Sequence, residues 1–374
     1  MEVRANNHDV KRVNKINTIR SILACERISQ REIAAQLDIS WPTVLQNVRE
    51  LVELGLVEEV GTFDSTGGRK ARAFAPIHDA CLALGLDITE SHVGLALVNL
   101  VGEQLRYLRE ELAFQASETY FSAVREKLRA FVEQATDDPE KIVGMGISVP
   151  GIMDEDGQIM RKSLVLEVRD LPIKAFNAGL HCPATFINDG GAAGFAELRG
   201  REVKHNTVYL SLNNRVGGAI LADGKVYSGD TMRASEFGHC TLVPDGKPCR
   251  CGHRGCMEAY CSASVLSALS GGDLSAFFAG VRAGTETAVQ AWNEYLDWLA
   301  IGVNNLHMCY DCDVIVGGAV GGFLEEFGGN FRERLVRRSV YDTTASYLKT
   351  CQYRQDAAAM GAAMLQIEGY IQRL

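Results

Sequence analysis

The sequence predicts an α/β protein of two similar lobes, preceded by a small helical domain that ends in a two-stranded ribbon. Three observations lead to this fold class. Three short helical patterns with tight connections open the chain. Three strand patterns, an amphipathic helix and a buried strand follow Pro76, and a similar order recurs from residue 207. A length of 374 residues is too great for one ordinary core and agrees with two or three domains.

The first 55 residues predict three helices. Apolar residues recur at helical spacing over residues 13–25. Ser29 and Glu32 form a capping box, in which each side chain satisfies a free amide of the other residue, and this starts a second helix. Ser40 starts the third, with Pro42 in the first turn, where the missing N–H has no cost.

Residues 56–76 predict a ribbon that completes a winged helix-turn-helix. Gly55 ends the third helix, and residues 56–60 and 69–74 read as two strands around a basic tip. A generic helical bundle would also fit such short helices, but Asn and Gln on the third helix favour base recognition, with Glu50 as an objection. The residues expected to contact DNA are Thr43, Gln46, Asn47, Arg49, Arg69 and Lys70.

After Pro76 the pattern predicts an internally duplicated fold with a cleft between two lobes. In the first lobe we expect strands at 81–88, 93–98, 104–112 and 142–149 and a helix at 120–134. In the second we expect strands at 207–212, 217–221, 225–227 and 314–316 and helices at 286–308, 324–338 and 356–372. The predicted domains are 1–76, 77–190 and 191–374.

Charge and composition exclude some classes of protein. The formal net charge of -9 argues against a protein that coats nucleic acid. Residues 1–75 nevertheless hold 11 Lys and Arg against 10 Asp and Glu, a net of +1, which leaves -10 for the rest of the chain. No apolar run approaches the roughly 20 residues that span a bilayer, and the N-terminus is polar, so a cytoplasmic location is expected.

The densest group of metal-ligand residue types predicts a metal site. His239, Cys249, Cys251 and Cys256 offer one imidazole and three thiolates, a closed tetrahedral set for one structural Zn²⁺. A disulfide between Cys249 and Cys251 would be strained because the two residues are so close in sequence, and unpaired thiols are the remaining alternative.

The other cysteines have plainer interpretations. We assign Cys240, Cys261 and His253 to packing or solvent, because four ligands already close a zinc shell. Cys309 and Cys312 could form a redox pair, but their place between an apolar helix and a buried strand favours buried structural cysteines.

Carboxylates flank the predicted metal loop. Glu236 and His239 precede it and Glu258 follows it, and carboxylates held in this way suit bonding to the vicinal hydroxyls of a sugar. Asn188 and Asp189 lie at the end of a buried strand, where ligands of α/β folds gather. Asp189 could act as a general base or cap the following helix, and spacing alone favours the cap.

These motifs resemble the ROK family (repressors, open reading frames, sugar kinases), and the resemblance extends over nearly the whole chain. The motifs are Glu236-x-Gly-His239, Cys-x-Cys-Gly-x-x-Gly-Cys-x-Glu258, Ser148-Val-Pro-Gly151, Asn188-Asp189 and Gly317-Gly318. The resemblance implies an actin/hexokinase-like, ribonuclease H-like duplicated domain. It also implies sugar-binding roles for Gly151, Ser163, Asn188, Asp189, Glu236, His239 and Glu258. In a kinase of this family Asp189 would be the base that activates the 6-hydroxyl.

The sequence departs from the kinases of the family at two phosphate loops. Residues 87–91 read Asp-Ile-Thr-Glu-Ser in place of Asp-x-Gly-Gly-Thr, which fills the space for phosphates and adds a negative charge. Residues 213–215 read Asn-Asn-Arg in place of Gly-Thr-Gly. Only the glycine-rich stretch 317–322 agrees with the kinase pattern, so we expect no enzyme.

The sequence as a whole therefore predicts a sugar-responsive transcriptional repressor. Its winged helices would bind operator DNA as a homodimer or homotetramer, and a sugar or sugar phosphate in the cleft between the lobes would release it. One alternative is a sugar 6-kinase that uses Asp189 as base. Another is a repressor released by docking to a sugar-transport protein.

Overall fold

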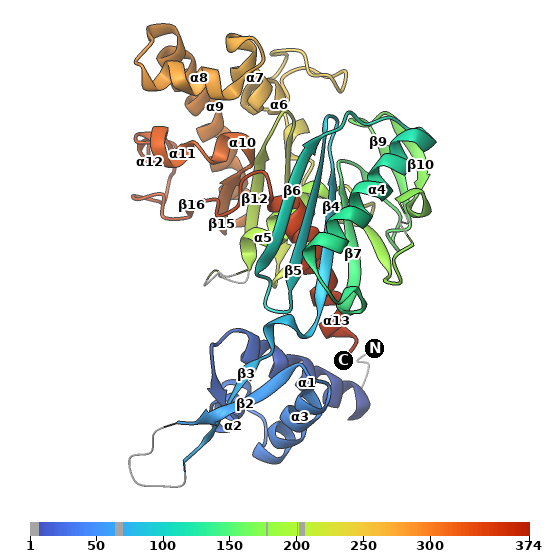
Figure 1. Cartoon of the computed structure of the whole chain (residues 1–374). Coiled ribbons are helices and arrows are strands. Elements are labelled where there is room, and N and C mark those ends of the chain that lie inside the picture. Colours follow the sequence, from blue (N-terminus) through green and yellow to red (C-terminus); the bar gives the residue numbers. More distant parts are fainter. Residues whose placement is uncertain (1–6, 64–69, 177–178, 200, 202–205) are drawn as a thin grey trace.

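The computed structural model describes residues 7–63, 70–176, 179–199, 201 and 206–374 (Figure 1). An N-terminal domain, blue in Figure 1, lies below two larger lobes. Each lobe is built on a five-stranded sheet. The predicted fold class, a two-lobed α/β protein behind a winged helix-turn-helix, is confirmed.

Three helices and a three-stranded sheet form the N-terminal domain. They are α1 (Asn7–Leu23), α2 (Gln30–Leu37), α3 (Trp41–Glu53), β1 (Ile28–Ser29), β2 (Val57–Thr62) and β3 (Arg72–Pro76). The predicted capping box is present: Ser29 Oγ accepts from the amide of Glu32 at 3.2 Å, and Glu32 Oε2 accepts from the amide of Ser29 at 2.8 Å. Strand β1, which the sequence pattern did not indicate, pairs with β3 and joins the ribbon to the helices.

The first lobe has the sheet order β11-β7-β4-β5-β6. Its strands are β4 (Leu82–Ile88), β5 (His92–Asn99), β6 (Gln104–Glu111), β7 (Ile142–Val149) and β11 (Ala184–Asn188), and α4 (Glu118–Ala135) packs beside β5 and β6. Every residue of β4 is buried, which explains its continuous apolar sequence. A small sheet of β8 (Ile152–Met153), β9 (Ile159–Ser163) and β10 (Val168–Pro172) was not predicted, because these strands are short and irregular in pattern.

The second lobe repeats this plan with the sheet order β16-β15-β12-β13-β14. Its strands are β12 (Asn206–Leu212), β13 (Val216–Ala222), β14 (Lys225–Tyr227), β15 (Asp313–Gly317) and β16 (Leu348–Thr350). Its helices are α6 (Glu258–Cys261), α7 (Ala263–Ser267), α8 (Leu274–Arg282), α9 (Glu286–Tyr310), α10 (Gly318–Gly321), α11 (Leu324–Phe327) and α12 (Phe331–Val336). In both lobes an antiparallel meander continues into two parallel strands, so the predicted duplication is confirmed.

Two helices pack together between the lobes. They are α5 (Asp189–Leu198) and α13 (Ala357–Gln372). α13 packs on β4, β5 and β7 of the first lobe, whereas α5 packs on β12 and β13 of the second. A Cβ atom built on Gly361 would lie 1.7 Å from the carbonyl oxygen of Ala192, so the two backbones approach as closely as only glycine permits.

The predicted domain limits need two corrections. The limit between residues 190 and 191 falls inside α5, because the strand-to-helix turn at Asn188 belongs to both lobes. Residues 191–374 are not one lobe, since α13 returns to cover the sheet of the first lobe. The predicted helix at 324–338 is two short helices, α11 and α12, separated at Gly328 and Gly329.

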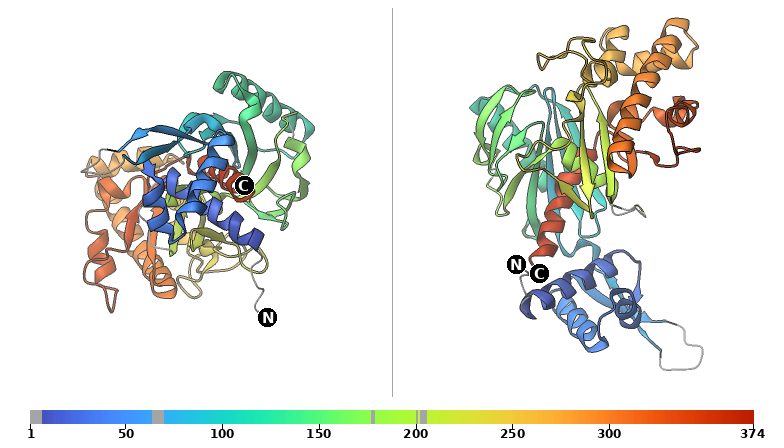
Figure 2. Two further views of the ribbon diagram at one scale, coloured as in Figure 1. Left: turned by 90° about the horizontal axis from the view of Figure 1, so that it is seen from below. Right: turned by 180° about the vertical axis from the view of Figure 1, so that it is seen from behind.

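The N-terminal domain shares its hydrophobic core with α13. Buried side chains of α1, among them Ile16 and Ile19, form one continuous cluster with Met364, Ile367 and Ile371. An ion pair between Arg20 and Glu368 lies at the same junction. The C-terminal end of α13 accordingly lies next to the N-terminal domain in the right-hand view of Figure 2.

Among the described residues, no single helix is long and apolar enough to cross a membrane. One pair of helices, Ala263–Ser270 and Leu274–Arg282, has the length and composition of a membrane span, but the two helices are bent by 75° relative to each other. Phe277 and Phe278 of this pair are buried in the core of the second lobe.

Candidate functional site

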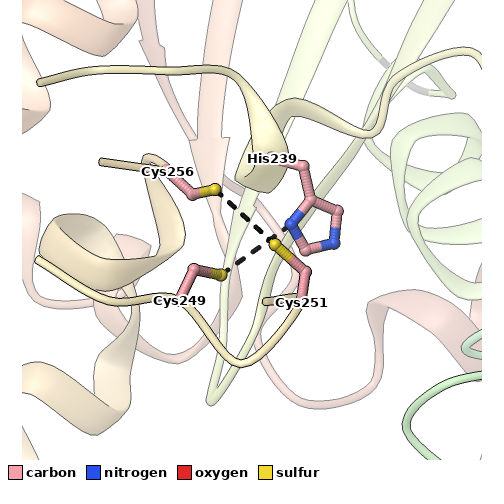
Figure 3. Close-up of side chains that lie close together, drawn as sticks. All are labelled: His239, Cys249, Cys251 and Cys256. Atoms are coloured by element: carbon pink, nitrogen blue, oxygen red, sulfur yellow. Dashed lines mark hydrogen bonds between the residues drawn. The ribbon is translucent and has the colours of Figure 1, made fainter. Parts of the chain in front are cut away.

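The predicted metal ligands lie together. One ligand atom from each of His239, Cys249, Cys251 and Cys256 lies within 4.8 Å of the others (Figure 3). The Sγ atoms of Cys251 and Cys256 are 3.7 Å apart, and Nδ1 of His239 is 4.0 Å from Sγ of Cys249. A tetrahedral zinc with bonds of about 2.3 Å requires a sulfur–sulfur separation of roughly 3.8 Å. The donor set therefore fits a zinc ion in both chemistry and spacing.

The loop reaches this geometry through tight turns. Gly252 and Gly255 have φ angles of +93° and +80°, which favour glycine. A Cβ atom on Gly255 would lie 1.7 Å from the carbonyl oxygen of Val243, so a side chain at this position has no room. Burial and the neighbouring thiols raise the pKa of Cys256 to about 12.

The cysteines outside the cluster are free thiols and differ in exposure. Cys261 is fully buried in the core, whereas Cys240 and His253 are exposed, as packing and solvent roles require. Cys309 is exposed and Cys312 is half-buried. The prediction of two buried structural cysteines is wrong at Cys309, because its side chain faces outward in the last turn of α9.

Glu258 links the metal loop to residues 213–216, where the sequence departs from the second phosphate loop of the kinases. Its side chain is buried, and Oε2 accepts from the amide of Val216 at 3.3 Å. Oε1 lies 3.4 Å from Nη1 of Arg215 and 3.8 Å from Sγ of Cys249. Arg215 was noted in the sequence only as a departure from a glycine-rich loop, and its ion pair with Glu258 required the three-dimensional structure. The orientation of Glu258 thus depends on both loops.

Asn188, not Asp189, caps α5. Oδ1 of Asn188 accepts from the amide of Gly191 at 3.0 Å, and its Nδ2 donates to the carbonyl of Gly151 at 3.2 Å. The expected cap role of Asp189 is therefore wrong. Asp189 is half-buried in the first turn of the helix, and burial followed by the charge of Glu236 raises its pKa. Its carboxyl accepts from the backbone amide of Gly190, and the charge of Glu236 acts on it.

Gly151 and Ser163 hold the loop between β7 and β8 in place. The hydroxyl of Ser163 donates to the carbonyl of Pro150 at 2.6 Å and accepts from the amide of Leu166 at 2.9 Å, and the residue is buried. A Cβ atom on Gly151 would lie 2.8 Å from the carbonyl oxygen of Lys162. The structure thus gives Ser163 a supporting role and does not support the predicted direct contact with a sugar.

The first departure from the kinase pattern contains a buried carboxyl group. Asp87 is 6% exposed and accepts a hydrogen bond from Oγ of Ser148 at 2.8 Å. Burial, with a smaller contribution from the charge of Asp189, raises the pKa of Asp87 to about 6. The Thr89 hydroxyl closes the following turn by accepting from the amide of His92 at 2.9 Å.

The second departure bonds to the remaining glycine-rich stretch. Oδ1 of Asn213 accepts from the amide of Ala319 at 2.8 Å, and Nδ2 donates to Oγ of Ser211 at 3.1 Å. Ala319 follows Gly317 and Gly318 at the start of α10. The Asn213 side chain therefore takes an amide that a glycine at position 213 would leave free for a ligand.

Asp87→Asn is expected to stabilise the protein at neutral pH. The folded chain holds the Asp87 proton more tightly than the unfolded chain does, so the free energy of unfolding falls as the pH rises from 3.8 to about 6. Removing this ionisation should add about 1 to 3 kcal/mol at pH values above the folded pKa. Thermal unfolding between acid and neutral pH measures the effect. The exposed Asp156→Asn is the control, and a less stable Asp87→Asn protein at neutral pH would contradict the prediction.

Helix α3 presents part of the predicted reading face. Gln46 is exposed and donates to Oε1 of Glu50 at 3.1 Å. Glu50 is paired with Lys11 at 3.1 Å and Lys15 at 3.3 Å, so its charge is balanced within the domain and the objection to DNA binding is removed. Thr43 is half-buried at the start of the helix, and Arg49 and Lys70 are exposed.

Asn47 does not belong to this face. It is 1% exposed, and its Nδ2 donates to Oγ1 of Thr18 at 3.0 Å. The prediction that Asn47 reads bases is wrong, because its position on the helix lies beside the buried stripe of Val44, Val48 and Leu51. Arg69 lies outside the described residues.

Two apolar side chains on α3 were missed. Trp41 is 53% exposed and Leu45 is 42% exposed. Their separation of four residues places both on one helix face next to Arg49. A helical projection centred on the buried stripe would have identified this surface from the sequence.

Comparison with known proteins agrees with this architecture. A model of the ROK family matches residues 83–368, and a model described as winged helix-turn-helix DNA-binding matches residues 13–58. A xylose repressor of Caldicellulosiruptor bescii is 26% identical over 366 residues, which cover 89% of this chain and 90% of the repressor. An N-acetylmannosamine kinase of Citrobacter koseri is 31% identical over 299 residues, which cover 75% of this chain and 97% of the kinase.

Solved structures show the same fold. A ROK family transcriptional regulator, described as a homolog of the E. coli MLC protein, superposes with a TM-score of 0.76 at 19% identity and covers 97% of both chains. A ROK family glucokinase of Streptomyces griseus superposes with a TM-score of 0.65 at 24% identity and covers 76% of this chain and 98% of the kinase. Because the family model spans most of the sequence, this chain belongs to the ROK family.

Proposed function

We propose that the chain is a sugar-responsive transcriptional repressor. The observation that carries the proposal is the joining of a winged helix-turn-helix to a ROK double lobe through one continuous core. Relatives that match over almost the full length of this chain are named xylose repressors. A winged helix binds operator DNA through α3, and a ligand between the lobes is placed to act on the neighbouring α5 and α13.

The proposed sugar site lies where Asn188 ends β11 and Asp189 begins α5, and where Glu236, His239 and Glu258 flank the metal loop. Three carboxyl groups can accept hydrogen bonds from sugar hydroxyls. Asn188 also bonds to Gly151, and Ser163 supports the same loop, so these residues position the site. A sugar can switch the repressor between two arrangements of its lobes if it binds one arrangement more tightly than the other, and nothing more is required.

One zinc ion per chain would be structural. His239, Cys249, Cys251 and Cys256 would occupy all four positions of its shell, which leaves none for catalysis. The bound ion would supply a fixed connection between the two ends of the loop. His239 and Glu258 would then keep their orientation toward the sugar.

A sugar 6-kinase is the second candidate. The half-buried carboxyl of Asp189 at the start of α5 favours it, as does the N-acetylmannosamine kinase relative. Three features oppose it: the amide of Ala319 is bonded to Asn213, Asp87 is surrounded by protein, and side chains replace glycines at positions 89 and 90. Phosphate groups need close backbone approach and free amides, which these residues deny.

One experiment separates the two candidates. Protection of genomic DNA fragments is measured with and without a panel of free sugars and sugar phosphates, and ATP consumption is measured with the same panel. The repressor requires DNA binding that one sugar abolishes. ATP consumption that disappears in Asp189→Asn would support the kinase. Binding that a sugar-transport protein alone relieves would identify the third alternative.

The proposed assembly is a homodimer or homotetramer, which would present two or more α3 helices to a palindromic operator. Thr43, Gln46, Arg49, Lys70 and Arg69 would contact bases or phosphates. Trp41 and Leu45 join this surface as apolar groups that suit the methyl group of thymine. Lysines and arginines on phosphates set affinity, whereas Gln46 is the residue placed to set sequence preference.

Gln46→Ala is expected to weaken operator binding and relax its sequence preference. The loss of a base contact should cost about 1 to 3 kcal/mol at one base pair. Arg49→Ala, the comparison variant, should weaken binding to all sequences and reduce its dependence on salt. Electrophoretic mobility shifts with a set of mutated operators measure both. Equal losses on every operator for Gln46→Ala would contradict its role in base recognition.

A further inference from the structure

Two buried nitrogen atoms at the end of α5 have no hydrogen-bond partner among the described residues. They are Nε and Nη2 of Arg199, which is the C-cap of this helix. The centre of the Phe195 ring lies 6.0 Å from the guanidinium carbon, at the outer limit of a cation–π contact. Arginine keeps its proton in proteins, so the group stays charged although these atoms are shielded from water. The burial of Arg199 is therefore unfavourable in this arrangement of the lobes.

The carboxylate nearest to Arg199 in the sequence is already occupied. Glu197 is fully buried and accepts from the amides of Gln352 and Tyr353 at 2.9 and 2.8 Å. It also accepts from Nη2 of Arg201 at 2.7 Å. These donors hold the end of α5 to the segment that leads from β16 into α13. Glu197 thus balances the charge of Arg201 and not that of Arg199.

The carboxylate of Glu368 on α13 also acts on Arg199. It forms an ion pair with Arg20 of α1 and accepts from Nε2 of Gln372 at 3.1 Å. Burial acts to raise the pKa of Glu368, but the bonds from Gln372 and Arg20 and the charges of both arginines together lower it. One carboxylate therefore acts on two guanidinium groups, and Arg20 holds it in this structure.

The two ends of α5 belong to different parts of the proposed switch. Asn188 and Asp189, at its start, belong to the proposed sugar site, whereas Arg199 follows its last turn. A helix of ten residues is about 15 Å long and moves as one body, so a displacement of its first turn reaches Arg199. Arg20 lies in the N-terminal domain, whose core continues onto α13. A shift of α5 thus acts where the N-terminal domain is attached to the lobes.

We propose that Arg199 is a positioning residue of the repressor, which competes with Arg20 for Glu368. In the described arrangement Glu368 holds Arg20, and the pair fastens α1 to α13. A sugar that displaces α5 brings Arg199 onto Glu368, which balances the charge of Arg199 and leaves Arg20 without its partner. The N-terminal domain then loses one of its contacts with the lobes. This role rests on the proposed function, since it is the contact through which the sugar reaches the DNA-binding domain.

The competition can be tested without sugar or DNA, by hydrogen–deuterium exchange of the full-length chain. Arg20→Met frees Glu368 for Arg199, so the amides of residues 16–23 should exchange roughly 3- to 10-fold faster than in the unaltered chain. Arg199→Met removes the competitor and should leave their exchange unchanged or slower. The double variant loses both pairs and should return to within about 2-fold of the unaltered chain.

The charge at position 199, and not the length of the side chain, should decide the result. Arg20→Met combined with Arg199→Lys keeps a cation there, so exchange should stay as fast as in Arg20→Met alone. Arg129→Met, at an exposed position of α4, is the control for the substitution and should have no effect. Exchange in the double variant of Arg20→Met and Arg199→Met that is as fast as in Arg20→Met, or faster, overturns the competition.

DNA and sugar give a second readout. The sugar of the panel that releases the unaltered chain should, at saturation, weaken operator binding at least about 5-fold less in Arg199→Met. Calorimetry establishes that the variant is saturated. Full release of Arg199→Met by that sugar overturns the role of Arg199. If no sugar releases the unaltered chain from DNA, the proposed function fails, while the exchange experiment still decides whether Arg199 and Arg20 compete for Glu368.

Discussion

Cys256→Ser is expected to abolish binding of zinc and to weaken sugar binding by about 10-fold or more, on the scale of lost metal-site contacts. Cys256 is buried, and its sulfur lies 3.7 Å from that of Cys251, so a serine removes a donor that no neighbour replaces. The loop would then lose the connection between His239 and Glu258. Metal content and calorimetric sugar titration measure the two effects.

The control for this variant is Cys240→Ser. Cys240 follows His239 directly but is exposed and lies outside the four ligands, so its substitution should leave both zinc and sugar binding intact. Operator binding without sugar should survive in both variants, because α3 belongs to another domain. A Cys256→Ser protein that kept full sugar affinity would show that the metal loop does not organise the sugar site.

Gly361→Ala is expected to have the largest effect on stability. The added methyl group would lie 1.7 Å from the carbonyl oxygen of Ala192 and 2.4 Å from its carbon, so α5 or α13 must move. Overpacking of this kind costs typically 1–3 kcal/mol, and a clash with backbone at this distance should exceed about 3 kcal/mol. Because Asn188 and Asp189 begin α5, sugar binding should fall as well.

A second glycine of the same helix provides a control with the opposite sign. The nearest atom to a Cβ on Gly369 is Nη1 of Arg373 at 3.7 Å, which leaves room for a methyl group. Gly369→Ala should therefore stabilise the helix by about 0.5–1 kcal/mol. Thermal and chemical unfolding compare the two variants. Similar stability of both would contradict the close packing of α5 on α13.

Local sequence patterns predicted most of the fold. The strands at 142–149 and 225–227 agree with β7 and β14 at both ends, because these segments combine a clear pattern with clear flanking breaks. The metal cluster was equally accessible, since its four ligands lie within 18 residues of one another. Such features depend on residues that are close together in the sequence, so a single sequence is enough to predict them.

Features that depend on distant contacts could not be predicted. The burial of Asn47 requires Thr18 of another helix, and the ion pair of Glu258 requires Arg215 from a loop 43 residues away. The place of α13 beside the first lobe follows from the sheet of residues 82–149 and not from its own apolar pattern. The cap of α5 was assigned to the wrong neighbour, because Asn and Asp are nearly equal in their preference for that position.

The shared core of the N-terminal domain and α13 has a consequence for biosynthesis. Residues 357–372 leave the ribosome long after residues 7–23, so α1 cannot reach its final packing until almost the whole of the described chain has been translated. A nascent chain would carry Ile16, Ile19 and Arg20 without their partners on α13. A chain that has not yet reached residue 357 would therefore leave this part of the core of the N-terminal domain uncovered.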